Sequence, residues 1–78
     1  MNPEEVKAII ENAMPGSTVS VEGDGIHFVA TVVSSEFRGK RLVEQHQLVY
    51  KALGSAMRER IHALSLKTYT PEQWERVK

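Results

Sequence analysis

The segment RERIHALSLKTYTPEQW, residues 58–74, does most to decide the fold. Apolar and polar residues alternate from Ile61 to Tyr69, which predicts a β-strand with His62 near its start. The residues that follow, Thr70, Pro71 and Gln73, have the pattern of a helix N-terminal capping box. The segment therefore predicts a strand and then a short capped helix, in which we expect Trp74 to anchor in the core.

The preceding residues predict a long helix from about Arg41 to Arg60. Gly54 should weaken this helix without ending it. In the segment SSEFRGK, Ser34 or Ser35 can cap a helical turn just before it. The apolar stripe of the long helix consists of Leu42, His46, Val49, Leu53 and Met57, with Val43 and Tyr50 beside it.

The N-terminal part of the chain predicts a helix and a hairpin. Asn2 can cap a helix that has Pro3 in its first turn, and Pro15-Gly16 should end it. Two strands follow, Ser17–Glu22 and Ile26–Val33, joined by the glycine-bearing turn GDG at 23–25. Within the second strand, one face carries Ile26, Phe28, Ala30 and Val32, and the other carries His27, Val29, Thr31 and Val33.

The resulting order is helix, strand, strand, helix, strand, helix. The second strand, the long helix and the third strand form a β-α-β crossover, which predicts that the two strands are parallel neighbours. Parallel strands begin at the same end of a sheet and lie about 4.8 Å apart. Since His27 and His62 stand at the starts of these strands, we expect the two imidazoles to project close together.

The composition describes one small domain spanning residues 1–78, because a chain of 78 residues can build only one modest core. Ten basic and ten acidic residues give zero formal charge, which favours neither a nucleic-acid nor a membrane-surface protein. There is no cysteine and no apolar run of membrane-spanning length. The acidic, amphipathic first residues are not the pattern of a signal peptide, so we expect none. We expect a soluble, cytoplasmic protein.

Two interpretations of His62 remain open. The first is a partly buried histidine whose ring bonds a backbone carbonyl, and the second is a metal ligand together with His27. Two imidazoles are too few for a closed structural metal site, which normally has four ligands. A site here would be incomplete, so a partner or cofactor would supply the other ligands. His46, on the apolar stripe, is interpreted as a packing residue.

Other motifs give weaker signals. Arg38, Lys40 and Arg41 surround Gly39 and could contact phosphate oxygens. No nucleophile is paired with a base, and neither a dinucleotide-binding fingerprint nor a phosphate-binding loop is present. The sequence gives no indication of an enzyme.

The segments SSEFRGKRLVEQHQLVYKAL, residues 34–53, and IHALSLKTYTPEQW, residues 61–74, closely resemble the BolA family. The shared pattern is a phenylalanine and glycine before a helix with an H-x-x-V-Y-like segment, then an I-H-A-L strand and a T-P-x-x-W ending. The turn GDGIHF, residues 23–28, looks most like the IbaG-type bacterial subgroup. The resemblance covers nearly the whole chain.

This resemblance implies an α+β fold similar to class II KH domains, αββααβα, with a three-stranded mixed sheet against helices. It also implies partnership with a monothiol, CGFS-type glutaredoxin, with a [2Fe-2S] cluster held between the two proteins. The family's cluster-ligating histidine corresponds to His62, and His27 is the candidate for the second ligand in the hairpin. The glutaredoxin cysteine and glutathione would supply the thiolates. Such an adaptor would serve cluster trafficking or iron and redox regulation.

BolA proteins are also described as DNA-binding transcriptional regulators of stress response and cell morphology, which is the alternative function. The basic residues at 38, 40 and 41 would then contact DNA. The G-x-x-G loop through which KH domains bind RNA is missing, and near-neutral charge lowers the expected DNA affinity. We expect the isolated chain to be a monomer or a weak homodimer without membrane contact.

Overall fold

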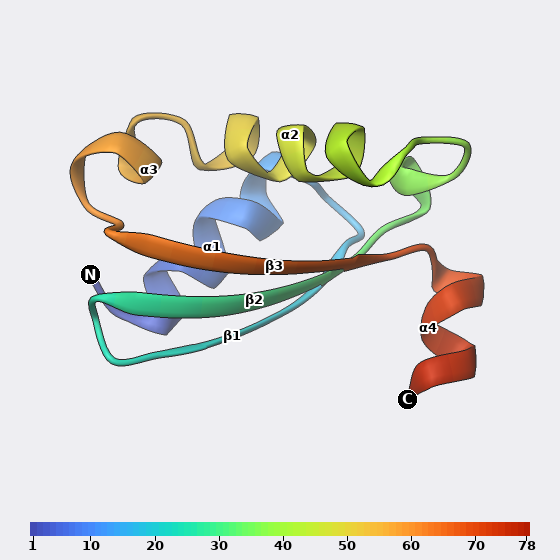
Figure 1. Ribbon diagram of the computed structural model, residues 1–78, viewed down its shortest axis with the longest axis horizontal. Coiled ribbons are helices and arrows are strands. Elements are labelled where there is room, and N and C mark those ends of the chain that lie inside the picture. Colours follow the sequence, from blue (N-terminus) through green and yellow to red (C-terminus); the bar gives the residue numbers. More distant parts are fainter.

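The computed structural model describes residues 1–78 as a two-layer arrangement of helices on a small sheet (Figure 1). The elements follow the order αββααβα, which confirms the expected fold class. A short 3-10 turn, η1 (Ser35–Phe37), lies between β2 and α2. The other elements are α1 (Pro3–Ala13), β1 (Thr18–Gly23), β2 (His27–Val33), α2 (Leu42–Leu53), α3 (Ser55–Glu59), β3 (Ala63–Tyr69) and α4 (Pro71–Val77).

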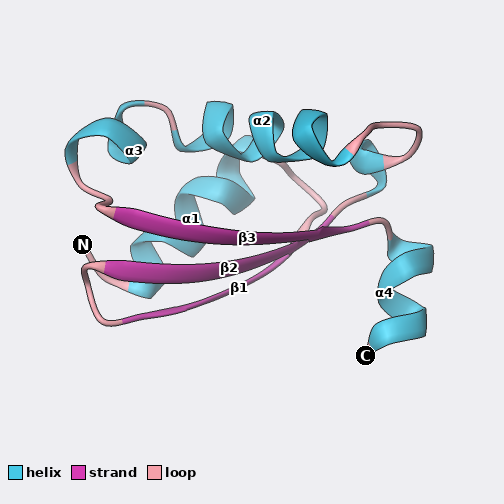
Figure 2. Ribbon diagram, in the orientation of Figure 1, coloured by secondary structure: helices cyan, strands magenta, loops and turns pink.

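The three strands form one mixed sheet in the order β1-β2-β3. Strand β2 pairs with β1 in the antiparallel sense and with β3 in the parallel sense, as the hairpin and the crossover predict. The β1-β2 hairpin turn, the start of β3 and the N-terminus lie at one end of the sheet, and α4 lies at the other (Figure 2). We call these the hairpin end and the α4 end.

The core lies between the sheet and the two helices α1 and α2. Phe28 is 1% exposed, and Ala30 and Val32 are fully buried on the same face of β2. Helices α1 and α2 cover this face with Val6, Ile10, Val49 and Leu53. The opposite face of the sheet is largely exposed, with Ser20, Val29, Ser65 and Lys67 on it. The alternation of side chains along each strand thus separates core from solvent.

The expected long helix is interrupted at Gly54, so that prediction was wrong. Gly54 has φ +56° and ψ −131°, a conformation that residues with a side chain rarely adopt. Its N–H still bonds Tyr50 O at 3.0 Å, which closes α2, and α3 begins at the next residue. Glycine here ends one helix and lets the chain change direction, instead of merely weakening a continuous helix.

Three other expectations need correction. Leu42 is not on the buried stripe: it is 62% exposed, and Gln45 points inward instead. Strand β3 starts at Ala63, two residues later than predicted, because the chain bends at His62. Trp74 is half-buried against Tyr69, with the ring centroids 5.4 Å apart, and does not reach the core.

Candidate functional site

His27 and His62 lie at the hairpin end of the sheet, as the parallel pairing predicts. His27 is the first residue of β2 and is in register with Ala63, the first residue of β3. His62 comes one residue earlier. Neighbouring strands are about 4.8 Å apart, and His62 lies one residue along the chain from the strand partner of His27.

Both imidazoles are available to a ligand. His27 and His62 are exposed, and neither side chain makes a hydrogen bond or an ion pair within the chain. The first interpretation of His62, a ring bonded to a backbone carbonyl, therefore finds no support. The bend before β3 explains the exposure, because it turns Ile61 into the core and leaves His62 outside.

The hairpin turn holds His27 through Asp24. Asp24 Oδ1 accepts hydrogen bonds from the backbone N–H groups of Ile26, at 2.9 Å, and His27, at 2.8 Å. These two bonds lower the pKa of the Asp24 carboxyl, and the bond from His27 has the larger effect. The Asp24 N–H donates in return to His27 O at 3.2 Å. The backbone of His27 is thus fixed while its ring remains free.

The chain alone offers an incomplete ligand set at this end. No group of three or more histidine, cysteine, aspartate or glutamate side chains is arranged to hold a metal ion. The nearby Arg60 is paired with Glu5 at 3.1 Å, which ties α3 to α1. A metal centre here would need further ligands from another molecule.

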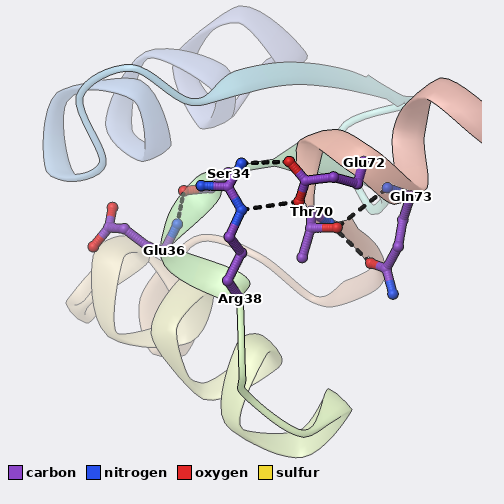
Figure 3. A network of polar contacts seen from close by, with 6 residues as sticks. All are labelled: Ser34, Glu36, Arg38, Thr70, Glu72 and Gln73. Carbon is purple, nitrogen blue, oxygen red and sulfur yellow. Dashed lines mark hydrogen bonds and ion pairs between the residues drawn. The ribbon is translucent and has the colours of Figure 1, made fainter.

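The three basic residues considered for nucleic acid lie at the α4 end, and each has a partner in the chain. Arg38 makes a two-point contact with Glu72 of α4 through Nε, at 2.9 Å, and Nη2 (Figure 3). Arg41 Nε lies 3.5 Å from Glu44 Oε1, and Lys40 Nζ donates to the backbone O of Glu36 at 3.0 Å.

The Arg38–Glu72 contact changes the titration of both groups. It raises the pKa of the Arg38 guanidinium and lowers the pKa of the Glu72 carboxyl, since each charge favours the ionised form of the other. Capping contacts frame the pair: Ser34 Oγ accepts from the Glu36 N–H, and Thr70 Oγ1 accepts from the Gln73 N–H (Figure 3). Within this basic segment, residues 38–41, Arg38 is therefore held by α4, whereas Lys40 and Arg41 contact groups in η1 and α2.

Two acidic residues that shape these sites, Asp24 and Glu72, were not predicted from the sequence. The glycines on both sides of Asp24 were a usable signal, because Asp in a tight turn often accepts bonds from backbone N–H groups just after it. Glu72 gave no signal, since it lies 34 residues from Arg38 and only the fold brings the two together.

His46, the third histidine, belongs to the packing of α2. It is half-buried, and its Nε2 atom is inaccessible and has no hydrogen-bond partner. The helix-packing interpretation fits this position, which lies on α2 and away from the two sheet-end histidines.

No helix in the chain combines the length and apolar character needed to cross a membrane.

Comparisons with known proteins agree on one family. The model of the family described as BolA-like protein matches residues 1–73. The acid stress protein IbaG of Escherichia coli is 39% identical over 77 residues, which cover 97% of this chain and 92% of that protein. The DNA-binding transcriptional regulator BolA of Vibrio cholerae is 39% identical over 75 residues, covering 96% of this chain and 68% of that protein.

A solved structure supports the same relationship. The bolA protein homologue from Coxiella burnetii superposes with a TM-score of 0.90 and 49% identity, covering 96% of this chain and 97% of that one. The similarity therefore extends over the hairpin end and over the basic segment with its partner helix α4.

Proposed function

The chain belongs to the BolA-like family, and from that premise we propose that it is a non-enzymatic adaptor for a monothiol glutaredoxin. In the complex, His62 and His27 ligate a [2Fe-2S] cluster that bridges the two proteins. The observation that carries the proposal is a pair of exposed imidazoles without partners at one end of the sheet, in a chain that has no cysteine.

The residues present fit one half of such a cluster site. A [2Fe-2S] cluster takes four ligands, and two histidines can replace two cysteines on one of its irons. This chain offers two imidazoles and no thiolate, and the glutaredoxin cysteine with glutathione would complete the set. When bound, the cluster would supply iron and sulfide for transfer and a one-electron redox centre.

The chain's own contribution is to hold the two rings in place and to keep them accessible. The Ala63 N–H donates to Ile26 O at 3.1 Å, which joins β3 to the turn beside both histidines. An imidazole binds a metal through a neutral ring nitrogen, and the nitrogens of both rings make no hydrogen bond or ion pair within the chain.

The test is anaerobic reconstitution of the purified chain with a monothiol glutaredoxin, iron, sulfide and glutathione, followed by absorption and circular dichroism in the visible range. We expect His62→Ala to abolish the spectrum of the mixed cluster and His27→Ala to change it. His46→Ala is the control for a histidine removed elsewhere and should keep the wild-type spectrum. An unchanged spectrum for His62→Ala would remove His62 as a ligand, and failure of the wild type to form the complex would refute the proposal.

A second candidate function is DNA binding, favoured by the name of the Vibrio cholerae relative. The contacts would come from Arg38, Lys40 and Arg41, in a regulator of stress response and cell morphology. DNA phosphates would first have to displace Glu72, Glu44 and the Glu36 carbonyl from these residues.

Charge reversal at the three basic positions tests this candidate. Binding to duplex DNA should collapse, and the salt dependence should fall by about one unit of slope for each phosphate that the protein no longer neutralises. A matched reversal of Lys67, on the exposed face of β3, should have little effect. Equal DNA binding by the triple variant and the wild type would exclude this role.

A further inference from the structure

Asp24 connects the hairpin turn to both histidines. Its Oδ1 atom bonds the N–H groups of Ile26 and His27, at 2.9 and 2.8 Å. The carbonyl of Ile26 in turn accepts the N–H of Ala63 at 3.1 Å, and Ala63 directly follows His62. Three hydrogen bonds therefore link one carboxylate to the backbone at both candidate ligands.

The turn has little freedom to shift relative to the core. A Cβ atom on Gly23 would lie 2.5 Å from His27 O and 2.6 Å from Cδ1 of the Phe28 ring. Since Phe28 is 1% exposed, the backbone at Gly23, directly before Asp24, lies close to a fixed core side chain. The carboxylate thus acts on a segment that is already confined.

We propose that Asp24 is a positioning residue, whose hydrogen bonds to the Ile26 and His27 amides set the separation of the two imidazoles. This inference rests on the proposed function, because it concerns the same pair of ligands. Asp24 is not itself a ligand, since no third histidine, cysteine, aspartate or glutamate side chain joins the pair in a metal-binding group. Partners that orient metal ligands typically change affinity by about 10–100-fold when removed.

Two variants and a control separate the positioning role from the effect of charge. Asp24→Ala removes the acceptor and the charge, whereas Asp24→Asn keeps an oxygen that can accept both bonds. Glu22→Ala removes another carboxylate at the same end, one that makes no hydrogen bond or ion pair. Only Asp24→Ala should therefore loosen His27.

The first measurement uses the isolated chain and Ni²⁺ alone, followed by paramagnetic broadening of the amide signals in NMR spectra. We expect Ni²⁺ to broaden the signals around His27 and His62 in the wild type. In Asp24→Ala the Ni²⁺ affinity should fall by about tenfold, while Asp24→Asn and Glu22→Ala should stay within about twofold. Without metal, the chemical shifts of Asp24→Ala should change only around residues 24–28 and 61–63.

Several outcomes would overturn the inference. They are wild-type affinity in Asp24→Ala, an equal loss in Asp24→Asn or Glu22→Ala, and no Ni²⁺ binding at the histidine pair of the wild type. Chemical-shift changes that extend along β2 to Val33 would mean a general loss of the hairpin and would also contradict positioning.

The second measurement repeats the glutaredoxin reconstitution with the same variants. A weakened or altered cluster spectrum in Asp24→Ala, restored in Asp24→Asn, is expected. If the wild type forms no mixed cluster but the Ni²⁺ series behaves as described, the proposed function fails while the positioning role of Asp24 stands. The two failures are thus distinguishable.

Discussion

The two ends of the sheet differ in whether their polar side chains have partners within the chain. At the hairpin end, the backbone around His27 is fixed by hydrogen bonds, but the imidazoles of His27 and His62 have no partner. At the α4 end, Arg38 and Arg41 are paired with carboxylates in the chain. A ligand can bind at the first end without breaking any contact, whereas at the second end it must compete.

This difference shows why residue type alone is a poor guide to a binding site. Three basic residues around a glycine suggest a phosphate site in the sequence. In the folded chain, however, the carboxylate of Glu72 already binds the first of them, Arg38. An arginine held at two points by a carboxylate already has the geometry that a phosphate would offer. The state of pairing therefore decides which of two plausible sites is open.

The largest expected effect tests how rigid the hairpin end is. Gly23→Ala would bring a methyl group to within 2.6 Å of the Phe28 ring and closer still to His27 O. We expect about 2–4 kcal/mol of destabilisation, because backbone and core must both move. Urea unfolding followed by circular dichroism measures this loss.

Gly39→Ala at the α4 end is the matched control. Gly39 has φ +75°, but nothing lies within 4 Å of an added Cβ. The cost should be only the left-handed backbone conformation, about 1 kcal/mol. Equal losses for the two variants would mean that the close packing of the hairpin turn does not matter.

The next effect concerns a buried polar network at the α4 end. Gln45 Nε2 donates to the carbonyls of Phe37, at 3.2 Å, and Lys40, at 3.0 Å, and its Oε1 accepts from Thr68 Oγ1 at 2.7 Å. Thr68→Val would leave that oxygen buried without a donor, at a cost of about 1–3 kcal/mol. Thermal unfolding measures the change.

Thr31→Val, on the adjacent strand, is the control for this network. Thr31 is half-buried and makes no side-chain hydrogen bond, so its loss of a hydroxyl should be nearly neutral. Combining Thr68→Val with Gln45→Leu should cost less than the sum of the two single variants, because the two residues satisfy each other. Strict additivity would show that the network is not coupled.

Much of the fold could be predicted because it depends on local patterns. The caps at Asn2 and Thr70, the hairpin turn and the strand alternation each act within a few residues, and the structure has all of them. Parallel pairing of β2 and β3 follows from the length of the crossover between them. The shared sheet end of His27 and His62 is a direct consequence of that pairing.

The errors arose where the decisive partner is distant or where glycine adopts a special conformation. Hydrophobicity placed Leu42 inside, but the carbonyls of the preceding turn and Thr68 draw Gln45 inward instead. The helix break needs the actual dihedral angles of Gly54. The pairing of Arg38 with Glu72 exists only in the folded chain, so no local pattern could predict it.

Acid should weaken both ends of the sheet together. A hydrogen bond from the backbone of Asn2 is the main cause that lowers the pKa of Glu5, and one from the backbone of His27 is the main cause for Asp24. The hydrogen bond from the Arg38 side chain lowers the pKa of Glu72. Each carboxylate therefore stabilises the fold above its ordinary pKa, and the contribution is lost as the pH falls through the lower, folded value. The ordinary pKa is 4.5 for Glu5 and Glu72 and 3.8 for Asp24, so the loss of stability begins near these pH values and continues below them.

Urea midpoints measured as a function of pH check this expectation. The triple variant with Glu5→Gln, Asp24→Asn and Glu72→Gln should show a flatter dependence below pH 4.5 than the wild type. Glu22→Gln, whose carboxylate makes no hydrogen bond or ion pair, is the control and should follow the wild-type curve. A triple variant that loses stability in acid as steeply as the wild type would refute the assignment.

The smallest effect sharpens the contrast between the paired and the open end. The Arg38–Glu72 contact is exposed, with both side chains 55% accessible, so Glu72→Gln should lower the unfolding midpoint only slightly at low salt. High salt should remove even this difference, because exposed charges are screened.

The variant nevertheless leaves Arg38 without its carboxylate. If the basic segment binds phosphate at all, Glu72→Gln should bind duplex DNA more tightly than the wild type, whereas the cluster spectrum at the opposite end should not change. Unaltered DNA binding would mean that internal pairing is not what keeps this end closed.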